Sequence, residues 1–309
     1  QKIIESTGVV SRPIIDATQC TSDLVYQAAV NLIKQTGIDP DQIGVMILVT
    51  QTPDYILPAT SCILHNRLNL CNDTIVFDIN LGCSGYIYGL YVASTLLKNS
   101  DKSFALLLAG DTISKYASND DASTRFIFGD AGSATLLEKD ESTNTMFFSL
   151  GTDGSGWQNL IIPAGGSRQK GNYENNKITI DQDGNKRTAE NLYMDGMEIF
   201  NFTISTVVPH IQYIIDKCGF PDIVVFHQAN RYMLEFMRKC LKIPKDKFLY
   251  SLGKYGNTSS ASIPLTLCSE LKKSDKTNKS LLSGFGVGYS WGSAMLNLQD
   301  TLLLNINEI

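Results

Sequence analysis

The residues around Cys83 in the sequence favour a reactive cysteine at this position. It follows an apolar run at 74–79, which is predicted to be a strand, and it opens a run at 86–97 that is predicted to be a helix, apolar on nearly every side. Unpaired N–H groups and the positive dipole end at the start of a helix favour a thiolate. The adjacent Gly82 and Ser84 are small and leave room for a substrate. A cysteine can also pack as a small hydrophobe, but this position favours a nucleophile.

Two polar residues in the second half of the chain are further candidates. His227 ends the apolar run 223–226, and strand ends in an α/β sheet point into the ligand crevice. A histidine there can equally be a hydrogen-bonded core residue. Asn257 precedes a helix that is predicted to start near Ser259, and taken alone it is better explained as a turn or N-cap residue.

Two further patterns are weak when taken alone. The run 285–288 is a glycine-rich turn that lacks the spacing of a nucleotide site, although its N–H groups could face an oxyanion. The stretch 231–247 holds six basic residues. A solvated helix face is the favoured explanation for them, and a dock for an acidic partner or a phosphate is the alternative.

Composition narrows the class of protein. The 309 residues are 43% hydrophobic and 18% charged, which is typical of a globular protein, and the net charge of −5 argues against nucleic-acid binding. Seven scattered cysteines without CxxC spacing predict reduced thiols in a cytoplasmic protein, and with only three histidines we expect no metal site. The longest apolar segments, such as 104–110, are too short for a membrane span, so no membrane partner is expected.

Apolar runs that alternate with helical stretches predict an α/β fold. Strands are predicted at 45–49, 74–79, 104–109, 223–226, twice within 124–137 and twice within 281–298; helices are predicted at 21–36, 58–68, 86–97, 198–217, from 228 to about 240, and at 259–272. The segments 129–137 and 289–297 share a Gly-Ser-Ala-x-Leu core at the ends of two halves, 1–148 and 149–309, which indicates a duplicated fold. The polar excursion 165–191 is predicted to cap a site.

Taken together, these motifs resemble one enzyme family. Cys83 in 78–85, the His-Gln-Ala-Asn of 227–230 and Asn257 in 256–259 are similar to the ketoacyl-acyl-carrier-protein synthase III enzymes of the thiolase superfamily. The supporting motifs are 129–132, 194–196 and 286–293, and the resemblance runs in consistent order from about Thr7 to the C-terminus.

The resemblance implies a thiolase-like fold of two similar halves, the first with the cysteine and the second with the histidine and asparagine. They would pack as a five-layer α-β-α-β-α sandwich, usually as a homodimer. It implies acyl-CoA or acyl-carrier thioesters as substrates, an acyl-carrier protein as partner and no cofactor. The opening strand and helix of the family precede Thr7, and we expect them to be missing from this sequence, which begins at Gln1.

The resemblance also implies a role for each site residue. Cys83 would take the acyl group, and His227 and Asn257 would hold the malonyl thioester oxygen during decarboxylation. Backbone N–H groups of Cys83 and Val287 would form the oxyanion hole, and Phe285 would position the malonyl group.

The resemblance implies further binding residues, and it includes a departure. Thr7, Leu57 and Phe285 would contact substrate. The carrier would dock on a basic surface, for which the matching residues are Arg231, Arg238 and Lys239. Lys2 and Ser6 stand where the family has a Trp and an Arg that bind the adenine of coenzyme A. An acyl donor bound to a carrier protein is therefore an alternative to acyl-CoA.

Other activities compete with condensation. The same Cys-His-Asn set could transfer an acyl group to an oxygen or nitrogen acceptor without decarboxylation. A papain-like hydrolase is disfavoured because its secreted context and local cysteine motif are missing. A non-catalytic partner subunit is disfavoured because such subunits are expected to lose the nucleophile, and Cys83 is present.

Overall fold

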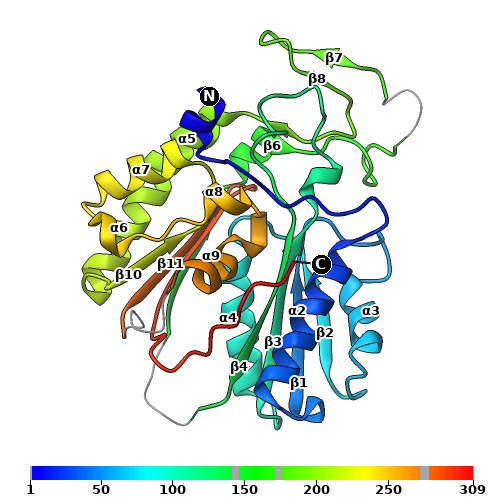
Figure 1. Ribbon diagram of the computed structural model, residues 1–309, viewed down its shortest axis with the longest axis vertical. Helices are drawn as coiled ribbons and strands as arrows, with labels where there is room; N and C mark the ends of the chain where they lie inside the picture. The colour runs from blue at the N-terminus through cyan, green and yellow to red at the C-terminus, as the bar shows by residue number, and fades with distance from the viewer. Residues whose placement is uncertain (1, 141–145, 172–175, 272–277, 309) are drawn as a thin grey trace.

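The computed structural model of the chain describes residues 2–140, 146–171, 176–271 and 278–308 (Figure 1). Its α-helices are α1 (Lys2–Thr7), α2 (Thr21–Thr36), α3 (Thr60–Arg67), α4 (Gly85–Lys98), α5 (Gly196–Phe202), α6 (Val208–Cys218), α7 (Arg231–Cys240), α8 (Leu252–Tyr255) and α9 (Ser262–Glu270). Its longer strands are β1 (Ile43–Val49), β2 (Ile75–Ile79), β3 (Phe104–Asp111), β4 (Ala131–Glu138), β5 (Phe147–Thr152), β10 (Ile223–Phe226), β11 (Ser280–Gly286) and β12 (Ser290–Leu296). The short strands are β6 (Leu160–Ile161), β7 (Thr179–Ile180), β8 (Lys186–Arg187) and β9 (Tyr193–Met194).

The first sheet has the strand order β2-β1-β3-β4, with β4 antiparallel and the other strands parallel. Its central strand β1 is buried along its whole length. Val45, Ile47 and Val49 face the middle of the molecule, whereas Met46 and Leu48 pack against α2 on the outside. An unbroken apolar run is what a strand covered on both faces requires.

The second sheet has the strand order β10-β11-β12-β5, and β5 is its first strand along the chain. β10 is parallel to β11, and β12 is antiparallel to both of its neighbours. Because β5 spans 147–152, the boundary expected between 148 and 149 falls inside this strand. The chain passes from one sheet to the other between β4 and β5.

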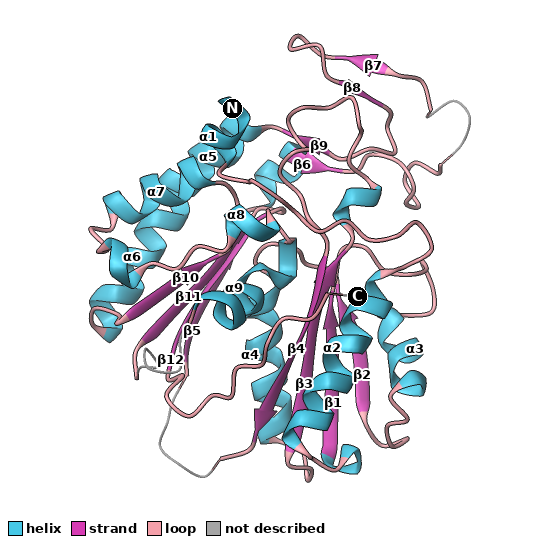
Figure 2. Cartoon of the chain, in the orientation of Figure 1, coloured by secondary structure: helices cyan, strands magenta, loops and turns pink. Residues whose placement is uncertain are grey.

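The two sheets lie side by side, with α4 and α9 between them (Figure 2). Side chains of both helices, such as Ile87 and Ile263, share one core with the inner faces of both sheets. α2 and α3 cover the outer face of the first sheet, and α6 and α7 cover that of the second. This is the predicted five-layer α-β-α-β-α arrangement of a thiolase-like fold.

The two halves repeat each other in strand register. Gly132 of β4 pairs with Gly110 of β3, and Gly292 of β12 pairs with Gly284 of β11. In each sheet the pair joins the last two strands along the chain, which are antiparallel. The Gly-Ser-Ala match in the sequence therefore falls on equivalent positions of a duplicated fold.

Some predicted elements differ from the structure. The strand predicted before Gly129 is a series of turns, in which Phe128 makes only an isolated bridge to Asn257. β5 was not predicted. The helix predicted at 198–217 contains a π-helical stretch, Thr203–Val207, between α5 and α6. The predicted helix 259–272 extends over residues outside those described.

The excursion 165–191 holds the β7–β8 pair and is fastened by Arg187, which forms ion pairs with Asp121 and Asp181. None of its described residues lines the cavity at Cys83. In the described part of the chain, every helix is too short or too polar to cross a lipid bilayer.

Candidate active site

Cys83 sits in a tight turn between β2 and α4. The N–H of Gly85 donates to the carbonyl of Gly82 at 2.7 Å, and α4 begins at Gly85, two residues after the cysteine. Cys83 therefore precedes the first helical turn instead of lying within it. Its side chain is buried, with 7% exposed, because α4 belongs to the central layer.

His227 follows the last residue of β10 and is held from two sides. Its backbone N–H donates to the carbonyl of Ser283 in β11 at 2.8 Å, and its Nδ1 lies 2.7 Å from the Ser262 hydroxyl. The residue is 1% exposed. Burial lowers the pKa of His227 to about 3, against a weaker opposite effect of the Ser259 backbone, so the imidazole is neutral at physiological pH.

Asn257 lies in the loop after α8 and is fixed by its backbone. Its N–H donates to the carbonyl of Ile127 at 2.8 Å, and its carbonyl accepts from Gly129 at 3.0 Å. The side-chain Oδ1 accepts from the N–H of Ser259 at 3.0 Å. Since Oδ1 is occupied by this bond, the Nδ2 group is the end of the amide that remains for a substrate.

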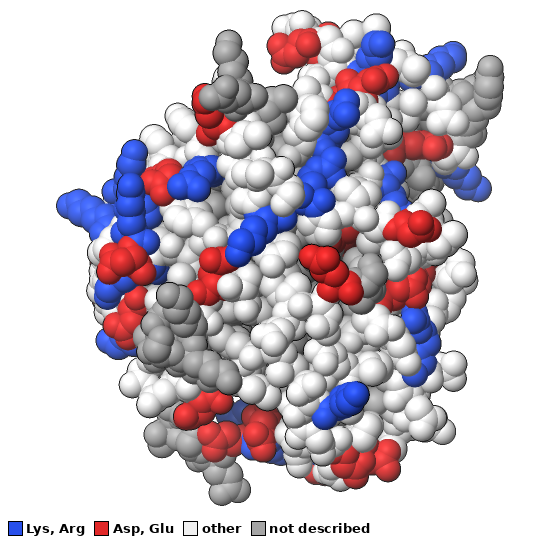
Figure 3. Space-filling view, in the orientation of Figure 1, with Lys and Arg blue, Asp and Glu red and all other residues white. Residues whose placement is uncertain are grey.

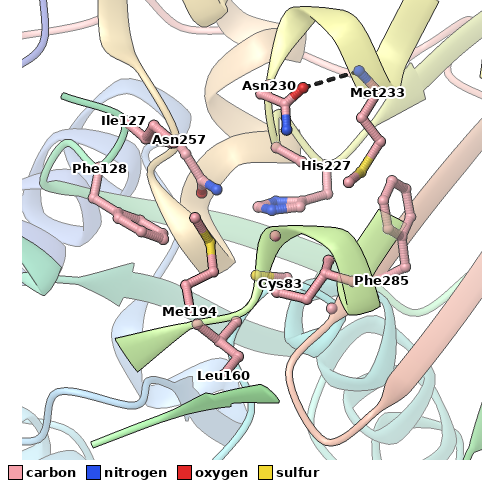
Figure 4. A pocket seen from close by; sticks show the side chains of 14 residues that line it. Cys83, Ile127, Phe128, Leu160, Met194, His227, Asn230, Met233, Asn257 and Phe285 are labelled. Carbon is pink, nitrogen blue, oxygen red and sulfur yellow. Dashed lines mark hydrogen bonds between the residues drawn. The ribbon is translucent and has the colours of Figure 1, made fainter. Parts of the chain in front are cut away.

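These three side chains gather around one cavity (Figure 4). The cavity measures about 60 Å³, and most of its wall is apolar, including Phe128, Leu160, Met194, Ile199 and Phe285. Cys83 reaches it from the first half of the chain, and His227 and Asn257 reach it from the second. A nucleophile and two polar groups that share a small apolar cavity are suited to chemistry on a thioester carbonyl.

The end of β11 lies directly over Cys83. A Cβ at Gly286 would come within 2.8 Å of the Cβ of Cys83, and one at Gly284 within 2.5 Å of its carbonyl oxygen. The turn that follows brings the N–H of Val287 to the sulfur, where a hydrogen bond lowers the pKa of Cys83. The glycines of this turn thus allow the close approach on which the position of Val287 depends.

The electrostatic state of Cys83 differs from the thiolate expected at a helix start. Burial, and then the negative charge of Asp111, raise the pKa of Cys83 to about 12. The N–H groups of Val287 and Cys83 and the hydroxyl of Ser259 act in the opposite direction. Desolvation exceeds these contributions, so the thiol is protonated at neutral pH in the absence of substrate.

Sequence reasoning missed Asp111, which ends β3 and is fully buried. One oxygen accepts from the N–H of Gln51 at 2.7 Å and from the Thr50 hydroxyl at 3.2 Å. The other accepts from the N–H of Ser260 at 3.1 Å and from its hydroxyl at 2.7 Å. Burial raises the pKa of Asp111 against these bonds. Its place at a strand end was the available indication.

Of the three predicted substrate residues, Phe285 lines the cavity, and Thr7 and Leu57 do not. Phe285 is 1% exposed and lines it. Thr7 ends α1, and its hydroxyl accepts from the N–H of Val9 at 3.2 Å. Leu57 is 80% exposed in the loop before α3 and does not line the cavity.

The predicted docking residues lie on α7, where basic side chains are visible in Figure 3. Arg231 and Lys239 are exposed. Arg238 is buried, pairs with Glu235 at 3.0 Å and donates to the carbonyl of Ile243 at 2.6 Å. Its charge is therefore engaged inside the protein, and of the three predicted docking residues only Arg231 and Lys239 offer a cation to a partner.

Two family models match the sequence. The model described as 3-oxoacyl-(acyl-carrier-protein) synthase III matches residues 77–154, which include Cys83, and the model of its C-terminal part matches 221–298, which include His227 and Asn257.

Full-length relatives agree with this match. Over 304 residues, 97% of this chain and 85% of the relative, the sequence is 40% identical to the Campylobacter jejuni protein named "Putative 3-oxoacyl-(acyl-carrier-protein) synthase 3". A solved 3-oxoacyl-(acyl-carrier protein) synthase from Burkholderia xenovorans LB400 is similar with a TM-score of 0.92 and 38% identity, covering 99% of this chain and 88% of that one. A second solved structure, a 3-oxoacyl-(acyl-carrier-protein) synthase III, is similar with a TM-score of 0.90 and 39% identity, over 96% and 90%.

Proposed function

The chain belongs to the 3-oxoacyl-(acyl-carrier-protein) synthase III family, and we propose that it joins an acyl group on Cys83 to a malonyl-carrier thioester. The observation that carries this proposal is the convergence of Cys83, His227 and Asn257 on one apolar cavity. Each half of the chain supplies only part of this set, so the reaction requires both halves.

In the first step Cys83 Sγ attacks the carbonyl carbon of an acyl thioester. A new thioester forms at Cys83, the bond to the donor sulfur breaks, and the thiol proton of Cys83 leaves with the departing thiol. The pKa of about 12 keeps the thiol protonated until the donor arrives. The Val287 N–H and the Ser259 hydroxyl stabilise the negative charge that develops on the sulfur during attack.

In the second step the malonyl thioester loses carbon dioxide, and negative charge develops on its thioester oxygen. A neutral His227 suits this step because the one ring nitrogen that carries a proton can donate a hydrogen bond to this oxygen. In the tautomer that this step requires, the Ser262 hydroxyl, 2.7 Å from Nδ1, donates to that atom, and Nε2 carries the proton. Asn257 Nδ2 is the second donor to the same oxygen.

In the third step the enolate carbon attacks the carbonyl of acyl-Cys83. The N–H groups of Cys83 and Val287 donate to the oxyanion of the tetrahedral intermediate. When that intermediate collapses, the Cys83 sulfur leaves and takes a proton from solvent, which balances the loss of the malonyl carboxylate as carbon dioxide, and the β-ketoacyl product stays on the carrier. Phe285 limits the space in which the malonyl group can lie.

We expect the donor to be an acyl-CoA or an acyl-carrier thioester that Thr7 contacts, and we expect no cofactor to take part. An acidic carrier protein would meet Arg231 and Lys239 on α7. The exposed Leu57 would reach the acyl pocket of a second copy in a homodimer.

Purified protein incubated with acyl donors and malonyl-carrier tests the proposal. We expect an added acyl mass at Cys83, release of carbon dioxide and a β-ketoacyl-carrier product. Cys83→Ala should abolish the added mass, whereas His227→Ala and Asn257→Ala should impair decarboxylation more than acylation. Acylation without carbon dioxide release, followed by transfer to a hydroxyl or amine, would favour the alternative acyltransferase. Persistent labelling of another cysteine in Cys83→Ala would defeat the assignment of the nucleophile.

A further inference from the structure

A second cavity of about 210 Å³ adjoins the cavity at Cys83. Its wall includes Arg12, Ser114, Asn119 and Arg125. Phe128 lines both cavities and is itself buried. The two cavities therefore share Phe128 as a wall residue, and two other wall residues of the larger cavity, Arg12 and Arg125, are cations.

Arg12 has no direct partner for its charge. Within the described residues its guanidinium donates no hydrogen bond and forms no ion pair, although the side chain is half-buried. Burial and the nearby Arg125 lower the pKa of Arg12, and Asp130 opposes them. The stem of Arg12 packs against Gly129 and Gly256, where a Cβ would come within 3.3 Å and 3.2 Å of its own. This packing explains the position of the stem and leaves the guanidinium, which is partly open to solvent, available to a ligand.

The other charges beside the cavity do not balance the two arginines. Asp130 accepts from the N–H of Ile15 at 3.1 Å and from the N–H of Ser114 at 3.0 Å, as well as from the Ser114 hydroxyl. Arg125 donates to the backbone carbonyl of Asn119, and its guanidinium lies 4.6 Å from the centre of the Phe126 ring. Two guanidinium groups thus line one cavity, and none of the described residues that line it carries a carboxylate, an arrangement that an anion would stabilise.

We propose that this cavity is a subsite for an anionic group, a carboxylate or phosphate, at the far end of the acyl group carried by Cys83. The proposal rests on the proposed function, because it assigns the acyl group of that reaction to a chemical class. An acyl group that outgrows the smaller cavity meets Phe128, and Arg125 lines the space on its other side. The guanidinium groups of Arg12 and Arg125 offer the forked donors that bind carboxylate and phosphate.

Succinyl-CoA and butyryl-CoA test the subsite, because both acyl groups have four carbons and only one ends in a carboxylate. Intact-mass measurement gives the rate at which each labels Cys83. We expect the succinyl group to label the wild type faster. Arg125→Gln should lower the succinyl-to-butyryl rate ratio about tenfold or more, the effect of losing a hydrogen bond to a charged group. Arg125→Lys should retain part of the preference, and Arg168→Gln, which removes an exposed charge outside the cavity, should leave the ratio unchanged.

Three results would go against the subsite. Equal labelling by the two thioesters, unaltered in Arg125→Gln, would overturn it and leave the proposed function intact. Inorganic phosphate should slow succinyl labelling more than butyryl labelling; binding of phosphate without any effect on labelling would assign the cavity to a free anion instead. No labelling by any acyl thioester would contradict the proposed function itself.

Discussion

Ser259, Ser260 and Ser262 all bond polar groups of the site. The hydroxyl of Ser259 bonds the Cys83 sulfur, that of Ser260 bonds Asp111, and that of Ser262 bonds His227. They share one short segment that begins at Asn257. One segment from the second half of the chain therefore sets the relative positions of the nucleophile and both thioester-binding side chains.

Asp111→Asn should change stability and reactivity in opposite directions. We expect the free energy of unfolding to fall by about 1.5–3 kcal/mol, because an amide cannot accept all the bonds that the buried carboxylate accepts. Removal of the negative charge should lower the pKa of Cys83, because Asp111 raises it. Iodoacetamide should therefore alkylate Cys83 faster at neutral pH.

Urea unfolding and peptide-resolved alkylation measure these two effects. Asp101→Asn, at an exposed position, is the matched control and should change neither. An alkylation rate in Asp111→Asn equal to or below that of the wild type would show that Asp111 does not govern the charge on Cys83.

His227 should make stability depend on pH below neutrality. Its pKa is about 3 when folded and 6.5 ordinarily, so between these values the unfolded chain binds a proton that the folded chain does not. Stability should therefore rise with pH over this window and gain nothing further from His227 above it. Urea unfolding from pH 4.5 to 7 should give a smaller slope for His227→Gln than for the wild type. An unaltered slope would mean that His227 is protonated in the folded protein.

At the scale of elements, the site depends on how closely β11 approaches the start of α4. Gly284 and Gly286 bracket Phe285 and meet the backbone and side chain of Cys83. The strand can approach in this way only because neither glycine carries a Cβ. The same approach brings Val287 to the sulfur, so the oxyanion donor and the nucleophile are positioned by one contact between the two halves.

Gly286→Ala should disrupt this contact. The added Cβ would lie 3.0 Å from the Cys83 sulfur, and the φ of +157° is already rare for other residues. We expect the rate of Cys83 acylation to fall about 10²–10³-fold, as when one oxyanion donor is lost. Gly154→Ala adds a methyl group with nothing within 4 Å and should leave the rate unchanged. The acylation rate is measured by quenching the reaction with an acyl thioester at successive times. Equal rates for the two variants would show that acylation does not depend on the close approach of β11 to Cys83.

Strands were predicted correctly where the sequence has a continuous apolar run. The prediction failed where a strand forms only by pairing with residues far away in the sequence. The buried strands β1, β3 and β10 follow from their apolar runs, because both faces are covered. The apolar residues before Gly129 resembled another strand, but Phe128 pairs only with Asn257. β5 becomes a strand through its pairing with β12, which no local pattern near 147–152 shows.

At the scale of the whole molecule, the fold follows from the family motifs and the duplicated Gly-Ser-Ala, but the charge state of the site does not. The sequence indicated that Cys83 lies at a helix start, which favours a thiolate. It gave no measure of how deeply the central layer buries the sulfur, and burial raises its pKa to about 12. Asp111 was missed for a similar reason, because its contacts to Ser260 exist only once both halves are packed together.

The central layer should make the two halves unfold as one unit. Leu282 of β11 is 1% exposed and packs in the core that α4 and α9 share with both sheets. Leu282→Ala should lower the free energy of unfolding by about 2–5 kcal/mol, the cost of a cavity in a packed core. Leu302→Ala, at a 51% exposed position, should change it by about 0.5 kcal/mol or less. Far-ultraviolet circular dichroism and the fluorescence of the two tryptophans, Trp157 after β5 and Trp291 in β12, should report one coincident transition in both variants. The transitions should coincide because each sheet needs the shared central layer to cover its inner face. Two separated transitions in Leu282→Ala would show that each half folds independently.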